Sequence, residues 1–407
     1  SACLVGSEMC IRDRILIVSW MIMDLAMEMP VPNFQYYVIA LHGTGLALGI
    51  IGLANWVAMA AVAFPGGYLA DKYGRRWLIT TMTFIMALSN LFYAFAPTWH
   101  FILIGSIVHS LCLIYQPALF AMVQDSLPPE RRGMGSSLIM LIHGTFNTPG
   151  PAIAGLLLWQ FGLVDSMRII YVIMTILYLI AAFWRLKLKE TVTNGDPEPI
   201  KARYFISSYP KAVKESIKVW KVLPPTVFWL FIVQILIMFG MSMTGVMNAI
   251  YAKQVLGIPE EQWWLTFIPL LLTMVVMSIP IGKMVDKIGR KTPLVLGLAV
   301  FASATVIFTV GNLVIVMIAM SMFAVGQLLV MSSAMALSTD LIDPANRGKV
   351  VGFRNFVGYI FNGFGMLLGN YLYITYFPQL PFYVTLSMMI PALLIVALLV
   401  HELQKPS

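Results

Sequence analysis

Residues 65–76 read PGGYLADKYGRR, a short charged segment between two long apolar runs. A second segment, residues 280–291, reads PIGKMVDKIGRK. The two share a proline, a glycine, an Asp-Lys pair and a Gly-Arg-basic ending at the same internal positions. From Asp71 to Asp286 the offset is 215 residues (286 − 71).

Two further pairs of segments have the same offset. DSLPPERRG at residues 125–133 matches DLIDPANRG at residues 340–348. Phe146-Asn147, followed by Gly150, matches Phe361-Asn362, followed by Gly365. Three pairs in one register indicate that the chain consists of two copies of one unit.

The composition predicts a membrane protein. The chain is 59% hydrophobic and 11% charged, with a mean hydropathy of +0.85. A spanning helix needs roughly 20 mostly apolar residues, and runs of that kind fill the sequence. We predict twelve helices, at about 15–41 with a break at Pro30-Val-Pro32, 45–64, 77–95, 101–124, 136–159, 167–184, 226–251, 263–281, 293–310, 313–338, 350–373 and 382–400.

The glycine-flanked Asp…Gly-Arg-Arg segment, present in both halves, resembles the signature of the major facilitator superfamily. The resemblance covers about Arg14–His401. It implies an all-α membrane protein with twelve transmembrane helices in two pseudo-symmetric six-helix bundles. General and drug–proton-antiporter-like members are the most similar. The chain departs from the drug antiporters of this family in two ways. They usually carry an arginine in helix 4, whereas this helix has no Arg or Lys and Gly105 lies near the expected position. They also carry a glycine-proline motif in helix 5, in which Thr148 and Ile153 replace glycines here.

The repeat and the loops predict four segments. Residues 1–14 are expected to be a non-native extension that forms neither a helix start nor a signal peptide. Residues 15–187 and 225–402 are the two predicted bundles. Residues 188–224 are a predicted cytoplasmic linker, either partly ordered or with an amphipathic surface helix over Tyr204–Trp220. The chain has a net charge of +8, and most of its Lys and Arg residues lie in the predicted loops on one side of the membrane. Cytoplasmic loops carry such an excess, which predicts that both termini are cytoplasmic.

In the resembled family the repeated loop holds the two halves together on the cytoplasmic side. That role is carried over to Asp71, Arg75, Asp286 and Arg290, whose carboxylates and guanidinium groups can pair. The alternative is that these charges only set the topology. The complete set of predicted latch residues is Gly67, Asp71, Gly74, Arg75, Arg132, Gly282, Asp286, Gly289, Arg290 and Arg347.

Ionisable side chains within predicted spans are costly and therefore candidates for function. Asp24 and Glu28 are spaced i, i+4 and share one face of the first helix. Their joint ionisation is disfavoured in a low dielectric, so at least one should hold a proton, as proton coupling requires. The alternative is that they face a wet cavity without titrating. His109 and His143 are further candidates, with hydrogen-bonded packing as the alternative.

Polar side chains of other predicted helices are candidates for a central cavity. Asn147 and Asn362 are related by the repeat, and repeats place substrate sites near mid-membrane. Interhelical hydrogen bonding is the alternative. The predicted cavity residues are Tyr36, Gln116, Asn147, Gln234, Gln327, Arg354 and Asn362.

These observations predict a secondary active transporter that moves a small organic solute by alternating access. Proton coupling and efflux of amphipathic compounds are favoured. The alternatives are an uptake symporter for a sugar or organic acid, a passive facilitator, and a non-transporting receptor or scaffold. No phosphate-binding loop or metal-ligand cluster is visible, so we expect no enzyme and no cofactor. We expect a functional monomer in the plasma membrane that binds solute, protons and lipid but no nucleic acid.

Asp71→Asn is expected to weaken transport while membrane insertion stays intact, because the latch loses its carboxylate. Uptake at matched expression measures this. Uptake equal to that of the parent would show that Asp71 has no latch role.

Overall fold

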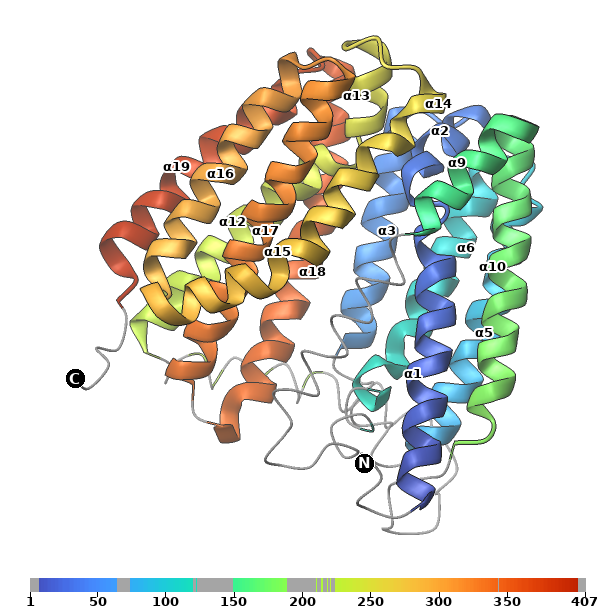
Figure 1. Cartoon of the computed structure of the whole chain (residues 1–407), viewed down its shortest axis with the longest axis horizontal. Helices are drawn as coiled ribbons and strands as arrows, with labels where there is room; N and C mark the ends of the chain where they lie inside the picture. The colour runs from blue at the N-terminus through green and yellow to red at the C-terminus, as the bar shows by residue number, and fades with distance from the viewer. Residues whose placement is uncertain are drawn as a thin grey trace. The chain divides into compact units, whose positions relative to one another are not determined.

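The computed structural model describes residues 7–63, 74–119, 149–188, 224–342 and 344–401, with Met122, Pro210, Lys214, Lys218 and Trp220. Of residues 7–13, 339–340 and 344–349 it describes the backbone alone. The regular structure of these ranges is helical (Figure 1). The chain forms two compact units, Ser1–His42 with Ala58–Lys211 and Gly43–Val57 with Ala212–Ser407.

The first unit is built on two long helices that pack side by side, α1 and α10, with α5 against α10 (Figure 1). Short helical turns extend two of its helices beyond a break. Its described elements are α1 (Ser7–Glu28), η1 (Val31–Asn33), α2 (Phe34–Ala40), α5 (Arg75–Ala94), α6 (Trp99–Cys112), η2 (Leu113–Tyr115), α9 (Pro149–Phe161) and α10 (Leu163–Arg185).

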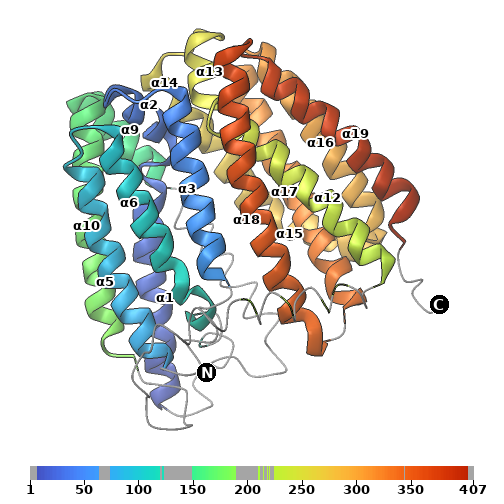
Figure 2. The ribbon, with the colours of Figure 1, turned by 180° about the vertical axis from the view of Figure 1, so that it is seen from behind.

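The second unit contains the longest helices of the described chain (Figure 2). It also contains Gly45–Val57 of α3 (Gly45–Ala63). Its other elements are α12 (Pro225–Gly245), α13 (Asn248–Gln254), α14 (Glu260–Trp263), η4 (Trp264–Thr266), α15 (Phe267–Ile288), α16 (Lys291–Val310), α17 (Leu313–Leu341), α18 (Pro344–Thr375) and α19 (Leu380–Leu399).

Both units use the same scheme of helix contacts. In the first unit α1 packs on α10 and α9, while α5 packs on α10 and α6. In the second, α12 packs on α19 and α18, while α16 packs on α19 and α17. These are the same pairs once each helix is matched to its partner 215 residues later. The predicted duplication is therefore present in the packing.

The first helix of each unit is broken within two residues of the same position in the repeat. In the first unit the break follows Glu28, and η1 and α2 continue beyond it. In the second it follows Gly245, and α13 continues. The Tyr37 hydroxyl on α2 donates to the Tyr93 carbonyl oxygen at 2.7 Å. The Tyr251 hydroxyl on α13 donates to the Thr309 carbonyl oxygen at 2.8 Å.

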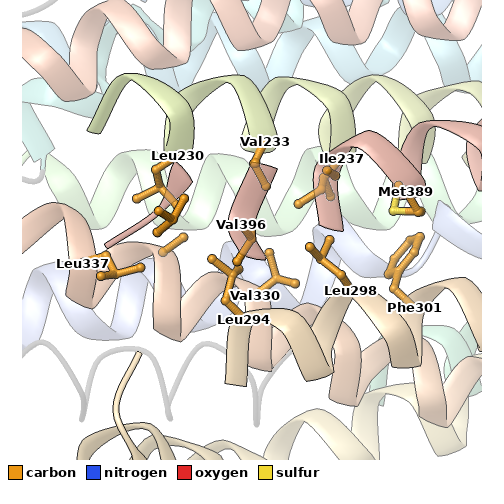
Figure 3. Close-up of a cluster of buried hydrophobic side chains, with 13 residues drawn as sticks. Leu230, Val233, Ile237, Leu294, Leu298, Phe301, Val330, Leu337, Met389 and Val396 are labelled. Carbon is orange, nitrogen blue, oxygen red and sulfur yellow. The ribbon is translucent and has the colours of Figure 1, made fainter. Parts of the chain in front are cut away.

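The core of the second unit is an apolar cluster between α12, α16, α17 and α19 (Figure 3). Leu230, Val233 and Leu298 in it are almost wholly buried. Lipid tails are as apolar as these side chains, so van der Waals packing rather than the hydrophobic effect holds such helices together.

Ten segments of the described residues are long and apolar enough to cross a membrane. They match the predicted spans except the fifth and the eleventh. Residues 136–148 of the predicted fifth span lie outside the described residues. Its described part is α9. The eleventh corresponds to α18, which has 32 residues. The predicted break at Pro30-Val-Pro32 is confirmed.

Several predicted boundaries are wrong. α1 begins at Ser7, so residues 7–14 do form a helix start. The predicted helix 226–251 is two helices. The eighth span runs from Glu260 to Ile288 and α18 begins at Pro344. α1, the eighth span and α18 extend beyond their apolar runs into segments with charged residues. A membrane helix needs apolar residues only where it meets hydrocarbon.

The predicted linker helix lies mostly outside the described residues. Lys214 and Lys218 are exposed. The Trp220 ring is half-buried and packs on Phe231 and Phe353, with centroid distances of 4.3 and 5.4 Å. The end of this segment is therefore attached to the second unit.

The repeated loop has the same backbone requirement in both copies. Gly74 has φ +92° and Gly289 has φ +105°, and 215 residues separate them. An L-residue strongly disfavours these conformations. Gly289 ends α15 and Gly74 precedes α5, so each glycine turns the chain into the next helix.

Gly289→Ala is expected to destabilise the protein by about 1–3 kcal/mol, because alanine is strained at this φ. Gly282→Ala is the matched control. It lies within α15, and a Cβ there would meet no described atom within 4 Å. Thermal unfolding of both variants in one detergent measures the difference. Equal midpoints would contradict the strain argument.

Candidate functional site

Asp24 and Glu28, the two carboxylates in the last two turns of α1, lie in the first unit at different levels. Asp24 is buried, with 5% exposure. Glu28 is half-buried and is the last residue of α1, directly before the break. Both make interactions with neighbouring groups. The predicted i, i+4 spacing is confirmed as helical geometry because both lie in α1.

Glu28 lies at a close approach of α9 to α1. A Cβ at Gly150 would lie 2.9 Å from the Glu28 Cβ and 3.1 Å from the Leu25 carbonyl oxygen. The second unit repeats this approach, since a Cβ at Gly365 of α18 would lie 2.8 Å from the Phe239 carbonyl oxygen on α12. A glycine therefore brings α9 within contact of the Glu28 position.

A buried arginine lies in the same unit. Arg185 ends α10 and has 0% exposure. Its Nε donates to Ser19 Oγ at 3.1 Å and its Nη1 to Thr83 Oγ1 at 2.8 Å. Its guanidinium carbon lies 5.4 Å from the centre of the Tyr115 ring. Three helical segments, α1, α5 and η2, thus enclose one cation.

Tyr178 connects these charges. It is 1% exposed and lies two turns before Arg185 on the same face of α10. It interacts electrostatically with Tyr115, Asp24, Arg185 and Glu28. The first unit therefore contains a buried polar cluster, which we call the α1–α10 cluster and define as Ser19, Asp24, Glu28, Thr83, Tyr115, Tyr178 and Arg185.

Sequence reasoning missed Arg185. The predicted sixth span ends at residue 184, one residue before it, and lysines follow closely. The structure places it at the end of α10, fully buried. The available signal was Ser19 and Thr83, hydroxyl side chains that lie within apolar runs and can accept from a cation.

The other predicted residues of this unit are spread along it. The His109 ring on α6 has its centroid 6.3 Å from that of Tyr178. Its Nδ1 is buried and has no hydrogen bond within the described residues. Tyr36 is buried on α2, and Gln116 is half-buried after η2. His143 and Asn147 lie outside the described residues.

In the second unit the predicted polar residues cluster partly on α18. Arg354 interacts electrostatically with Tyr359. The Tyr359 ring stacks on the Trp56 ring of α3 at 5.4 Å, and Trp56 Nε1 lies 3.0 Å from the Met366 sulfur. This group combines two aromatic faces, a thioether and one cation, which suits an aromatic organic molecule.

The remaining residues of the second unit are less connected. Asn362 is 6% exposed on α18. Gln234 is half-buried on α12. Gln327 on α17 lies 3.8 Å from the Met331 sulfur. These three stay candidates from the sequence. The described residues contain no group of three or more metal-ligating side chains.

The latch residues are described in part. Asp286 and Arg290 form an i, i+4 pair with Oδ1 and Nη2 4.0 Å apart, and Asp286 is 79% exposed. Such a surface pair contributes at most about 1 kcal/mol. Arg75 begins α5 and Gly74 directly precedes it. Gly67, Asp71, Arg132 and the Arg347 side chain lie outside the described residues. The latch therefore stays a prediction.

A neighbouring arginine has a defined contact. Arg76 Nη2 donates to the Leu186 carbonyl oxygen at 2.8 Å. It connects the start of α5 to the residue that follows Arg185. This bond supports the position of the α1–α10 cluster.

The repeated helical units, the apolar spans and the buried ionisable residues define a polytopic membrane protein of the transporter type. Its sequence matches the model of the Major Facilitator Superfamily over residues 16–271 and 230–407. The chain belongs to this superfamily.

The chain is similar to known transport and multidrug resistance proteins. The chain is 23% identical to multidrug resistance protein 2 of Bacillus subtilis (strain 168) over 88% of each chain. It is 23% identical to multidrug resistance protein MdtH of Proteus mirabilis (strain HI4320), over 90% of this chain and 87% of the relative. The solved nucleoside transporter NupG superposes with a TM-score of 0.74 at 13% identity, over 95% of this chain and 98% of its own.

Gly150→Ala is expected to destabilise the protein by about 1–3 kcal/mol, because the added methyl group meets the α1 backbone. Gly245→Ala is the control, since a Cβ there would meet no described atom within 4 Å. The measurement is thermal unfolding in detergent. A midpoint for Gly150→Ala no lower than that of the control would contradict the close approach of α9 to α1.

Proposed function

We propose that this protein is a proton-coupled exporter of amphipathic organic compounds. The observation that carries the proposal is the carboxylate pair of α1, with Asp24 buried and Glu28 at the α9 contact. Membership of a transporter superfamily supports a small-molecule substrate. The direction is supported by the relatives named multidrug resistance proteins.

The proton site of this proposal is Glu28. A carboxyl group in a low dielectric exchanges a proton when its surroundings change between two conformations. Glu28 lies directly before the Pro30 break and against Gly150 of α9. A shift of α9 relative to α1 would change its solvation, and its charge would in turn favour one arrangement of the two helices.

The proposed substrate contacts in the second unit are aromatic and polarizable. Trp56, Tyr359 and Met366 offer ring faces and a thioether. Such groups bind ligands through contact area with few directional demands, which suits varied amphipathic molecules. The polar contribution would come from Asn362, which is buried on the same helix.

One observation favours a second candidate. Arg354 is a cation on α18 beside Tyr359. A transporter of organic anions, including an uptake symporter for an organic acid, would use such a residue to bind the substrate carboxylate. Arg354→Gln distinguishes the two, because it would abolish transport of anions and spare transport of cations.

The proposed function includes an oligomeric state, a membrane and an orientation. The chain would function as a monomer in the plasma membrane, with both termini cytoplasmic, as the positions of Lys and Arg favour. A passive facilitator and a non-transporting scaffold are the competing outcomes, and a flux experiment separates them.

The test is flux of a lipophilic fluorescent cation, ethidium, in proteoliposomes with an imposed pH gradient. The parent is expected to move ethidium against its gradient until a protonophore is added. Glu28→Gln is expected to lose about 5–150-fold of the gradient-driven flux, the usual range of coupling, but to keep substrate exchange without a gradient.

Tyr376→Phe, at an exposed position outside these clusters, is the control and should match the parent. Flux that ignores the pH gradient would refute proton coupling. Gradient-driven flux of Glu28→Gln at the parental rate would remove Glu28 from the mechanism.

A further inference from the structure

Two charged side chains of the described residues are buried, and they have opposite signs. Asp24 has 5% exposure and Arg185 has 0%. Both lie in the first unit. An isolated buried charge is strongly unfavourable, whereas a compensated pair is tolerated. Two buried charges of opposite sign in one unit can therefore compensate each other.

The direct partners of Arg185 bring no negative charge. Ser19 and Thr83 are neutral acceptors, and Tyr115 presents its ring face. The Nη2 atom is buried and has no hydrogen bond within the described residues. These contacts orient the guanidinium group, but a guanidinium stays charged in proteins. A carboxylate nearby would compensate this charge.

The described elements that pack on α10 offer few carboxylates. Among its described side chains α1 supplies Asp24 and Glu28, and its Glu8 and Asp13 are described by their backbone alone. α2, α5 and α9 have no Asp or Glu. Asp165 lies at the opposite end of α10. Further titratable or charged groups on or beside these elements include Arg14 of α1, Arg75 and Arg76 of α5, His109 and Cys112 of α6, Tyr115 of η2, Tyr178 of α10 and Lys187 just after α10.

Tyr178 is within electrostatic reach of both charges. Arg185 also reaches α1 directly, because its Nε donates to Ser19 Oγ, five residues before Asp24 on the same helix. We propose that Arg185 is the counter-charge that keeps Asp24 ionised inside the first unit, which leaves Glu28 as the α1 carboxyl group that gains and loses a proton. The assignment of the exchanged proton to Glu28 rests on the proposed function. The pairing of Arg185 with Asp24 does not.

In this arrangement Arg185 is a positioning residue. It acts on the proton step through Asp24 and touches no substrate. The last turn of α10 suits a cation, because the helix dipole is negative there.

The experiment is infrared spectroscopy of the purified full-length protein at neutral pH, which detects the carbonyl band of protonated carboxyl groups. The parent should show a protonated-carboxyl band that Glu28→Gln removes and Asp24→Asn does not. Arg185→Gln should add a band for a second protonated carboxyl group. Adding Asp24→Asn to Arg185→Gln should remove the second band, and Arg185→Lys should not produce it.

Stability is the second readout. The neutral pair Asp24→Asn/Arg185→Gln is expected to unfold at a higher temperature than Arg185→Gln alone, since neither charge is then left uncompensated. If Arg185→Gln does not fold, folding of the double variant supports the pairing. Failure of the double variant where Asp24→Asn folds would overturn it.

A purely structural role for Arg185 predicts a different pattern. The double variant would then lose at least as much stability as Arg185→Gln, and no second carboxyl band would appear. Either result overturns the proposal. The spectra require no transport, so a failure of ethidium flux would refute the proposed function and leave the pairing decided by the spectra.

Discussion

The constraint on which this structure depends most is the cost of burying charge in a low-dielectric bundle. Uncompensated charges are excluded from such surroundings, and paired ones are retained where they serve a function. The first unit contains Asp24 and Arg185 as buried charges among the described residues. The buried polar side chains described in the second unit, such as Thr244, Asn362 and Asn370, are neutral.

The two units thus share an architecture but differ in their charge. The broken first helix, the tyrosine-to-carbonyl bond beyond the break and the glycine contact between α1 and α9 all recur in the second unit. The ionisable cluster does not recur in the part of the second unit that the structure describes. Duplication supplied two scaffolds, and we infer that the first unit specialised in proton handling and the second in contacts to an organic substrate.

Much of the fold could be predicted from the sequence. The 215-residue offset, the apolar runs and Pro30 gave the duplication, most spans and the break in the first helix, because these features depend on local chemistry. The break after Gly245 was not predictable from a proline, since none is present there. The extension of α1 back to Ser7 was not predicted, because residues 1–14 were interpreted as a non-native extension and excluded from the first helix.

The candidate site was predictable in part. Asp24 and Glu28 stand out because carboxylates are rare in apolar runs. Arg185 did not stand out, because it adjoins a lysine-rich segment and only tertiary packing on Ser19, Thr83 and Tyr115 shows that it is buried. Sequence position could not distinguish a cation that faces water from one that α10 places inside the bundle.

The proposed function places the exchanged proton on Glu28, so binding of substrate should change the proton occupancy of this carboxyl group. The most direct measurement is proton release from the purified protein in weakly buffered detergent solution when tetraphenylphosphonium is added. The account predicts that binding of the cation releases protons, and that Glu28→Gln binds it without release. Binding to the parent without any proton release would contradict the account.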